Sequence, residues 1–327
     1  MYRKASRILW ITFFTGVTLF SLYIISIHFN LGNLYGDMPD LRELENPRNE
    51  LASELYAADG VLLGKYYREN RSPVEFEDLS PNLVNALLAT EDIRFKEHSG
   101  IDFVGTIAIV WYILKGDDRG SSTITQQLAK NLFKTRDNGR LTGIPKRVSA
   151  KFKEWILSIR IERAYTKNEI MTMYLNTVDF GRNAFGIKVA SSVYFGKTPG
   201  TLNAQESAIL VGLLKAPTFY NPISNPENAL RRRNTVLNQM EKYLYITEAE
   251  CDSLKAIEID MSGYSEESHN AGMATHFRSI AQKFLSDWCK KSGYDLYEDG
   301  LKIYTTIDSR MQKYAEEAVA EHLPNLQ

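Results

Sequence analysis

The sequence predicts a mainly α-helical protein with an N-terminal transmembrane helix and a short α+β segment near its C-terminal end. Three patterns support this fold class: an apolar run near the N-terminus, apolar residues at helical spacing from Pro81 onward, and the alternating strand-like run GLKIYTTI after residue 299. The formal net charge of -1 argues against a general nucleic-acid-binding protein. The two cysteines, Cys251 and Cys289, match no zinc-binding pattern.

The membrane anchor is predicted at residues 8–29. The run ILWITFFTGVTLFSLYIISIHF has no formally charged residue and is long enough to cross about 30 Å of hydrocarbon as a helix. Basic residues precede it and the first acid is Asp37, so the positive-inside rule places residues 1–7 in the cytoplasm and the following chain outside. A cleaved signal peptide and a buried core helix are the alternatives, but the run has neither a small-residue cleavage site nor a polar face.

The segments after the anchor differ in character. Residues 30–54 are polar and contain prolines, which indicates a tether, and a hairpin is predicted around Asp59 and Gly60. Two helix starts have capping-box spacing: Thr123 with Gln126, and Thr166 with Glu169. After about residue 240 the pattern changes, and a strand that feeds a final helix resembles the opening of a further domain.

A basic cluster is the strongest chemical signal in the chain. Between Lys130 and Lys167 there are eleven Lys or Arg residues and three acids, a local charge of +8. Such a cluster repels itself unless an anionic group binds there. Phosphate groups, lipid headgroups and nucleic acid are candidates, and the predicted anchor favours a lipid-linked phosphate. A solvated basic surface is the alternative.

The run RVSAKFKEWILSI within this cluster predicts a helix with two faces. One face, expected to contact the core, carries Val148, Phe152, Trp155, Ile156 and Ile159. The other carries Arg147, Lys151 and Glu154, and is expected to point away from the core and hold a diphosphate beside one acid. The alternative is a surface ion pair between Lys151 and Glu154, worth a few tenths of a kcal/mol.

The run GSSTITQQLAKNLF predicts a second anion-binding element. Its Gly, Ser and Thr residues expose backbone N–H groups and hydroxyls at the start of a helix, a position that favours anions. Gln127 and Lys130 lie on a polar stripe of that helix. Simple helix capping is the alternative, and it accounts for Thr123 and Gln126 only.

Five segments in a fixed order carry a resemblance to a known family: EDIRFKEHSG, GSSTITQQLAKN, KFKE, YLNTVDFGRNAFG and LNAQESAILVGLLKAPTFYNP. Together they resemble the motif set of the family 51 peptidoglycan glycosyltransferases. These are the glycan-polymerising domains of class A penicillin-binding proteins and of monofunctional transglycosylases. The resemblance covers residues 55–240 and implies a lysozyme-like helical glycosyltransferase domain there.

The resemblance implies a reaction and its residues. Lipid II, a disaccharide-pentapeptide on undecaprenyl diphosphate, would be polymerised into glycan strands for cell-wall synthesis, with release of the diphosphate. Glu91 is expected to take the proton of the acceptor hydroxyl, because an alcohol is a poor nucleophile at neutral pH. Asp92 would support Glu91, and Glu154 would organise the cations or bind Mg²⁺ or another divalent ion. The residues expected to bind the diphosphate are Ser122, Gln127, Lys130, Arg147, Lys151 and Lys153. No organic cofactor is expected.

The chain departs from the family pattern in two motifs. The third motif has Ala150 where the family has arginine, and Arg147, one turn earlier, is expected to supply that charge. The second motif begins Gly120-Ser121-Ser122 where the family has Gly-Gly-Ser. His98, between Phe95 and Gly100, is expected to pack in a structural turn.

Residues 241–327 resemble the start of the linker and transpeptidase region of the bifunctional enzymes. Neither Ser-x-x-Lys nor Lys-Thr-Gly occurs in the 327 residues, so no transpeptidase serine and no acylation by β-lactams is expected. The apolar residues 102–114 are expected either to enter the membrane interface or to form a core helix.

The resemblance implies lipid II, the growing glycan strand, membrane lipid and other cell-wall synthesis proteins as partners, and no nucleic acid. It implies a single-pass protein of the inner membrane with an extracytoplasmic catalytic domain. A membrane-anchored hydrolase of lysozyme-like fold that cleaves peptidoglycan is the alternative enzyme, although a glycan-cleaving enzyme has no diphosphate to bind. A non-enzymatic scaffold would need neither Glu91 nor Glu154.

Overall fold

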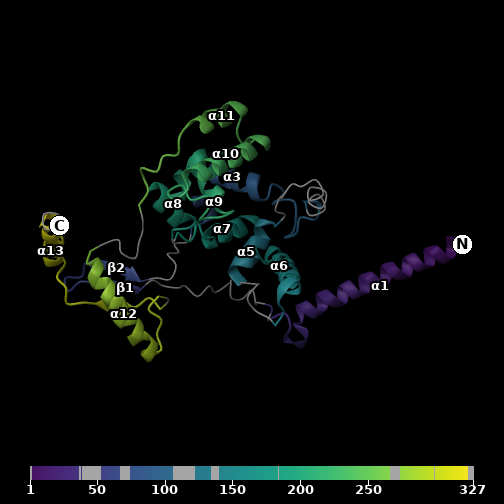
Figure 1. The fold of residues 1–327 in the computed structure, drawn as a ribbon, viewed down its shortest axis with the longest axis horizontal. Coiled ribbons are helices and arrows are strands. Elements are labelled where there is room, and N and C mark those ends of the chain that lie inside the picture. Colours follow the sequence, from purple (N-terminus) through teal and green to yellow (C-terminus); the bar gives the residue numbers. More distant parts are fainter. Residues whose placement is uncertain are drawn as a thin grey trace. The chain divides into compact units, whose positions relative to one another are not determined.

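The computed structural model describes residues 2–36, 38, 53–66, 74–105, 122–133, 140–182, 184–265, 273–297 and 299–322. Over these residues the chain is mainly helical, as the sequence predicts (Figure 1). It divides into two compact units: the first combines Met1–Glu45 with Val84–Val178, and the second combines Asn46–Leu83 with Asp179–Gln327. The first unit contains every predicted site residue.

The N-terminal helix α1, Tyr2–His28, coincides closely with the predicted membrane anchor. It is long and apolar enough to cross a membrane: the most apolar 18-residue window within Arg3–His28 has a mean hydropathy of 2.0 and no buried residue. At 1.5 Å per residue such a helix spans about 39 Å, which exceeds the hydrocarbon thickness of a bilayer. The helix begins before the predicted 8–29 because basic residues continue a helix as readily as apolar ones.

The first unit is built around helices α3, α5, α6 and α7. Their bounds are Pro81–Glu91, Ile124–Phe133, Gly143–Ala164 and Lys167–Thr177, and α3 belongs to this unit from Val84 onward. Helix α5 packs against both α6 and α7. Apolar side chains from these helices and from the turn after α3 are fully buried: Leu87, Phe95, Ile124, Leu128, Leu157, Ile161, Ile170 and Leu175.

The face of helix α6 that packs against the core is opposite to the predicted one. Its buried residues are Ser149, Ala150, Lys153, Glu154, Leu157, Ser158 and Ile161. The predicted core face contacts α1 instead, where Phe20 and Tyr23 meet Phe152 edge to face at ring-centroid distances of 5.6 and 5.7 Å. The expectation that Glu154 lies away from the core is therefore wrong. An apolar stripe indicates contact with another apolar surface, and here helix α1 supplies that surface.

Gly100 shows how closely the turn after α3 approaches α6. Its φ of +91° is a conformation that L side chains rarely adopt. A Cβ atom there would lie 2.8 Å from the backbone carbonyl carbon of Ser158. The glycine at this position of the first motif therefore allows a backbone-to-helix contact that any side chain would block.

The two predicted capping boxes have different outcomes. At the start of α7 the box is complete: Thr166 Oγ1 accepts from Glu169 N, and Glu169 Oε2 accepts from Thr166 N at 2.7 Å. At α5, Thr123 Oγ1 accepts from Gln126 N at 3.2 Å, but the Gln126 side chain donates to the Gly100 carbonyl instead of returning to the cap. Tertiary partners compete for this side chain, so only half of the second box forms.

The second unit contains four consecutive helices after the first unit ends. They are α8 (Ile187–Phe195), α9 (Ala204–Leu213), α10 (Pro226–Lys242) and α11 (Glu248–Ala256), with short 3-10 turns at Phe76–Asp78 and Pro199–Thr201. Helix α9 begins with a complete capping box between Asn203 and Glu206, and it ends at Leu213, before Pro217. Helices α9 and α10 pack against each other.

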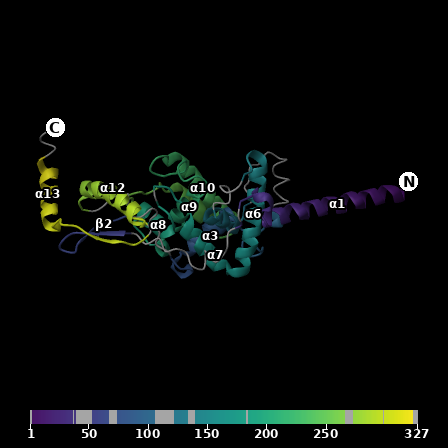
Figure 2. The same cartoon turned by 90° about the horizontal axis from the view of Figure 1, so that it is seen from below.

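A small sheet joins segments that are far apart in sequence. Strands β1, Ser53–Tyr56, and β2, Leu62–Tyr66, form the predicted hairpin, and β3, Lys302–Tyr304, pairs with β1 in parallel. Helix α12, Thr275–Ser292, lies beside β2 in both views (Figures 1 and 2) and shares an apolar cluster with the sheet. Strand β3 therefore completes the sheet of the early hairpin, and helix α13, Ser309–His322, follows it.

Candidate active site

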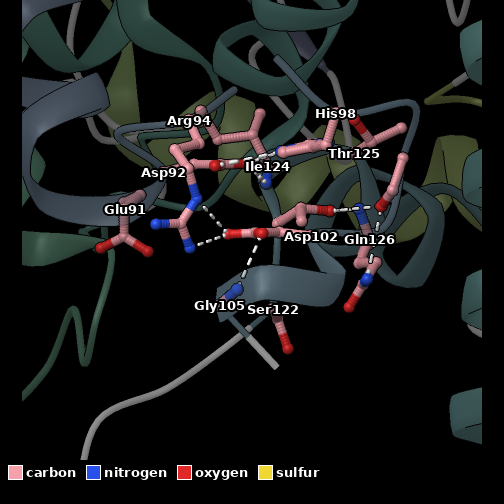
Figure 3. A network of polar contacts seen from close by, with 12 residues as sticks. Glu91, Asp92, Arg94, His98, Asp102, Gly105, Ser122, Ile124, Thr125 and Gln126 are labelled. Atoms are coloured by element: carbon pink, nitrogen blue, oxygen red, sulfur yellow. Dashed lines mark hydrogen bonds and ion pairs between the residues drawn. The ribbon is translucent and has the colours of Figure 1, made fainter. Parts of the chain in front are cut away.

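The first of the paired acids, Glu91, is the last residue of α3. Its side chain is half-buried, and its carboxylate Oε2 accepts a hydrogen bond of 2.9 Å from the amide Nε2 of Gln127 on α5. Figure 3 shows its carboxylate pointing away from Asp92 and His98. The apolar helix α3 therefore brings one partly accessible carboxylate to α5.

Asp92, the second acid, occupies a different environment. Its side chain is buried, both of its oxygens lie about 3 Å from His98 Nε2, and Oδ2 also accepts from the backbone N–H of Ile124 at 3.1 Å. Ile124 is the first residue of α5, so the carboxylate caps that helix where the dipole favours negative charge. This placement favours a structural role for Asp92 and His98.

The chain after this turn is held by an ion pair between Arg94 and Asp102. Arg94 Nη2 lies 2.5 Å from Asp102 Oδ2, and the backbone N–H of Gly105 donates to Asp102 Oδ1 at 2.8 Å (Figure 3). Burial alone would raise the pKa of Asp102, but the hydrogen bonds from Arg94 and Gly105 outweigh it and lower that pKa. Of the expected interfacial segment 102–114, only residues up to 105 are described, and Phe103 and Val104 are exposed.

Lys151 on α6 joins the second and third motifs. Its ammonium donates to Ser122 Oγ at 2.8 Å, to Gln126 Oε1 at 3.0 Å and to Glu154 Oε2 at 2.9 Å. Glu154 is buried, with a side chain 3% exposed, whereas the Lys151 side chain is 35% exposed. The predicted surface ion pair is thus a partly buried one in which the cation has three oxygen partners.

These contacts form one continuous polar network, the Glu91–Glu154 network, which consists of Glu91, Gln127, Ser122, Lys151 and Glu154. Gln127 links its two halves because Nε2 donates to Glu91 and, at 3.4 Å, to the Ser122 carbonyl. The structure therefore brings together five of the nine residues predicted for the site. One end of this network is the half-buried carboxylate of Glu91. At the other end, the ammonium group of Lys151 is paired with the buried carboxylate of Glu154.

The other four predicted residues lie outside this network. Asp92 caps α5, as described above. Lys130 on α5 and Arg147 on α6 are exposed and bind no described residue. Lys153 is buried, and its ammonium donates to the backbone carbonyls of Tyr35 and Gly36, the latter at 2.6 Å. Because Tyr35 and Gly36 follow α1, Lys153 connects α6 to the turn after that helix.

Two residues of the site were missed from the sequence. Gln126 accepts from Lys151, and Tyr174 on α7 donates from its hydroxyl to Gln127 Oε1 at 3.0 Å. Burial raises the pKa of the Tyr174 phenol well above its usual value, and the charge of Glu91 adds to that shift. Tyr174 lies in the quoted motif YLNTVDFGRNAFG, but a buried tyrosine at helical spacing is indistinguishable in sequence from a core residue.

The divalent cation expected at Glu154 stays a prediction. Next to the Glu154 carboxylate the structure places the ammonium group of Lys151. The described residues contain no group of three or more His, Cys, Asp or Glu side chains placed to hold a metal ion.

Comparisons with known proteins identify the family of this chain. The family model described as Transglycosylase matches residues 59–241. Penicillin-binding protein 1A of Escherichia coli is 35% identical over 92% of this chain, and that of Aquifex aeolicus is 38% identical over 89%. The chain spans only 35% and 38% of the length of these two relatives. A solved structure of penicillin-binding protein 1A from Haemophilus influenzae covers 82% of this chain and 28% of its own, with 23% identity and a TM-score of 0.46.

The matched region contains all five segments quoted from the sequence and every member of the Glu91–Glu154 network. It also covers more than half of the chain. The chain therefore belongs to the transglycosylase family and is, at the level of that family, a peptidoglycan glycosyltransferase.

Proposed function

We propose that this chain polymerises lipid II into glycan strands and releases undecaprenyl diphosphate. The observation that supports this most is the Glu91–Glu154 network within a chain of the transglycosylase family. Attack by a sugar hydroxyl needs a proton acceptor, and departure of a diphosphate needs positive charge. The network has a half-buried carboxylate at one end and a lysine ammonium at the other.

Glu91 is the general base in this proposal. As the hydroxyl oxygen of lipid II bonds to the sugar carbon of the growing strand, Glu91 takes the hydroxyl proton, and the bond to the diphosphate breaks on the opposite face. The hydrogen bond from Gln127 holds one carboxylate oxygen of Glu91 in place. A base and a departing group on opposite faces of the sugar follow the geometry of inverting glycosidases, with a sugar hydroxyl in place of water.

The diphosphate would bind the accessible cations of α5 and α6. Lys130 lies one turn beyond Gln127, and Arg147 lies one turn before Lys151, so helical spacing places each on the face of its network neighbour. Both are exposed and bind no described residue. Lys153 is assigned a different task here, because its ammonium is already bound to the carbonyls after α1.

Helix α1 would anchor the enzyme in the cell membrane with the N-terminus in the cytoplasm and the site on the extracytoplasmic side. Its basic first turn and its length support this orientation. The contact of α1 with α6 would keep the cation-bearing helix close to the membrane, where a lipid-linked diphosphate lies.

The test is incubation of the detergent-solubilised chain with labelled lipid II, followed by gel analysis of the glycan products. We expect polymeric strands and stoichiometric undecaprenyl diphosphate. A parallel incubation uses preformed glycan strands. Shortening of those strands without lipid II consumption would reject the transferase and support the alternative, a peptidoglycan hydrolase of lysozyme-like fold.

A further inference from the structure

We propose that Tyr174 is a positioning residue that orients the Glu91 carboxylate through the side-chain amide of Gln127. The Tyr174 hydroxyl donates to Gln127 Oε1 at 3.0 Å, and Gln127 Nε2 donates to Glu91 Oε2 at 2.9 Å. Three helices contribute to this chain of two hydrogen bonds: α7, α5 and α3. The inference rests on the function proposed above for Glu91.

The chemistry of the three groups permits one orientation of the Gln127 amide. A carboxylate only accepts hydrogen bonds, so the amide group facing Glu91 must be the donor, Nε2. The amide oxygen then faces Tyr174, whose hydroxyl hydrogen needs an acceptor because the side chain is buried. A turned amide would set oxygen against carboxylate oxygen and leave the phenol hydrogen without its acceptor.

Burial keeps this arrangement constant. Tyr174 is 1% exposed, and the raised pKa of its phenol keeps the hydroxyl protonated throughout the neutral range. The hydroxyl is therefore always available as a donor to Gln127. The second N–H of the amide is directed at the Ser122 carbonyl, 3.4 Å away, so contacts in three directions hold the amide plane.

Loss of the Tyr174 hydroxyl is expected to change the orientation of the Glu91 carboxylate rather than the fold. Glu91 stands at the end of a helix on a side chain with several rotatable bonds, and Gln127 holds one of its oxygens. Without the phenol hydroxyl, the Gln127 amide can rotate and present either oxygen or nitrogen to the carboxylate. Loss of one orienting hydrogen bond is expected to lower kcat for lipid II polymerisation about 5- to 10-fold, with little change in KM.

A double-mutant cycle tests whether Tyr174 acts through Gln127. Polymerisation of lipid II is measured for the parent chain, Tyr174→Phe, Gln127→Ala and the double variant. We expect Tyr174→Phe to lower kcat about 5- to 10-fold in the parent and less than about 2-fold in the Gln127→Ala background. Equal losses in both backgrounds would overturn the proposal, because a merely structural tyrosine would lower kcat by the same factor in each.

Tyr194→Phe is the matched control. Tyr194 on α8 is also fully buried, and its hydroxyl donates to the Phe180 carbonyl at 2.9 Å, with no described hydrogen bond to the Glu91–Glu154 network. We expect it to lower Tm like Tyr174→Phe while leaving kcat per folded molecule unchanged. A kcat loss of the same size in this control would also overturn the proposal.

Thermal unfolding gives a readout that does not depend on lipid II. The loss of Tm caused by Tyr174→Phe is expected to be smaller in the Gln127→Ala background, because the hydrogen bond is then already absent. A parent chain that does not polymerise lipid II would reject the proposed function, and this stability cycle would then decide the inference. Equal Tm losses in the two backgrounds would overturn it, and a smaller loss in the Gln127→Ala background than in the parent would support it.

Discussion

Two adjacent carboxylates, Glu91 and Asp92, belong to two regions with opposite properties. Glu91 is half-buried and begins the polar network that runs to Glu154. Asp92 is 7% exposed and is held by His98 and the first N–H of α5. Helix α3 ends at Glu91, and the two side chains point in different directions (Figure 3). The two residues are both acids, so the candidate base and the helix cap differ in the solvent exposure of their carboxylates and in the groups that donate hydrogen bonds to them.

The largest expected effect is on the Glu91 side of this comparison. Glu91→Gln keeps the shape of the side chain but cannot take the acceptor proton, so polymerisation of lipid II should fall roughly 10²- to 10⁴-fold. Tm should change little, because the amide oxygen can still accept from Gln127. Glu97→Gln, an exposed acid in the same turn, is the control and should keep the parent rate. A Glu91→Gln enzyme within a few-fold of the parent would remove Glu91 as the base.

Asp92→Asn should give the complementary result. The substitution replaces a charged acceptor at the start of α5 and next to His98 by an amide, so the free energy of unfolding should fall by about 1–3 kcal/mol. The rate per folded molecule should stay within a few-fold of the parent. Denaturant unfolding beside the exposed control Asp287→Asn measures the difference. A loss of rate equal to that of Glu91→Gln, with parental stability, would place Asp92 in the reaction.

A smaller effect is expected for Arg147, which lies about one turn before Ala150 on α6. Arg147→Ala should raise KM for lipid II about 10-fold, because a charge-assisted contact to phosphate is lost. Arg163→Ala removes an equally exposed arginine from the last turn of α6 and serves as the control. If both variants raise KM equally, Arg147 is only one charge among many and does not replace the motif arginine.

The smallest effect concerns acid stability at Asp102. The hydrogen bonds from Arg94 and Gly105 lower its pKa, so the folded state holds the ionised form more tightly than the unfolded state does. This stabilisation is fully present above the unfolded pKa of about 4 and is lost as pH falls through the lower folded pKa. The Tm difference between the parent and Asp102→Asn should therefore be larger at pH 7 than at about pH 3. A difference that does not change with pH would contradict the shift.

Local features of this fold were readable from the sequence. The apolar N-terminal helix, the Asp59-Gly60 hairpin and the Thr166–Glu169 cap all depend on residues within a few positions of one another. The motif acids Glu91 and Glu154 were singled out from the sequence, and their roles in the reaction stay predictions.

The sequence patterns led to wrong expectations where the partner of a helix face or of a side chain lies far away in the chain. The periodicity of α6 located its apolar stripe but not the partner of that stripe, which is α1, and so Glu154 was expected on the wrong face. Likewise, Lys153 looked like one more cation of the basic cluster, whereas it binds two carbonyls more than a hundred positions earlier in the chain.

The mainly helical pattern, the apolar N-terminal segment and the acids and cations available for chemistry were all visible in the amino-acid sequence. Three remote contacts became visible only in the fold: Gln127 joins Glu91 to Ser122, Tyr174 donates to Gln127, and β3 pairs with β1. The physical reason is distance along the chain. Helix propensity and capping act between near neighbours, whereas a buried hydrogen bond or strand pair depends on which remote segments exclude water together.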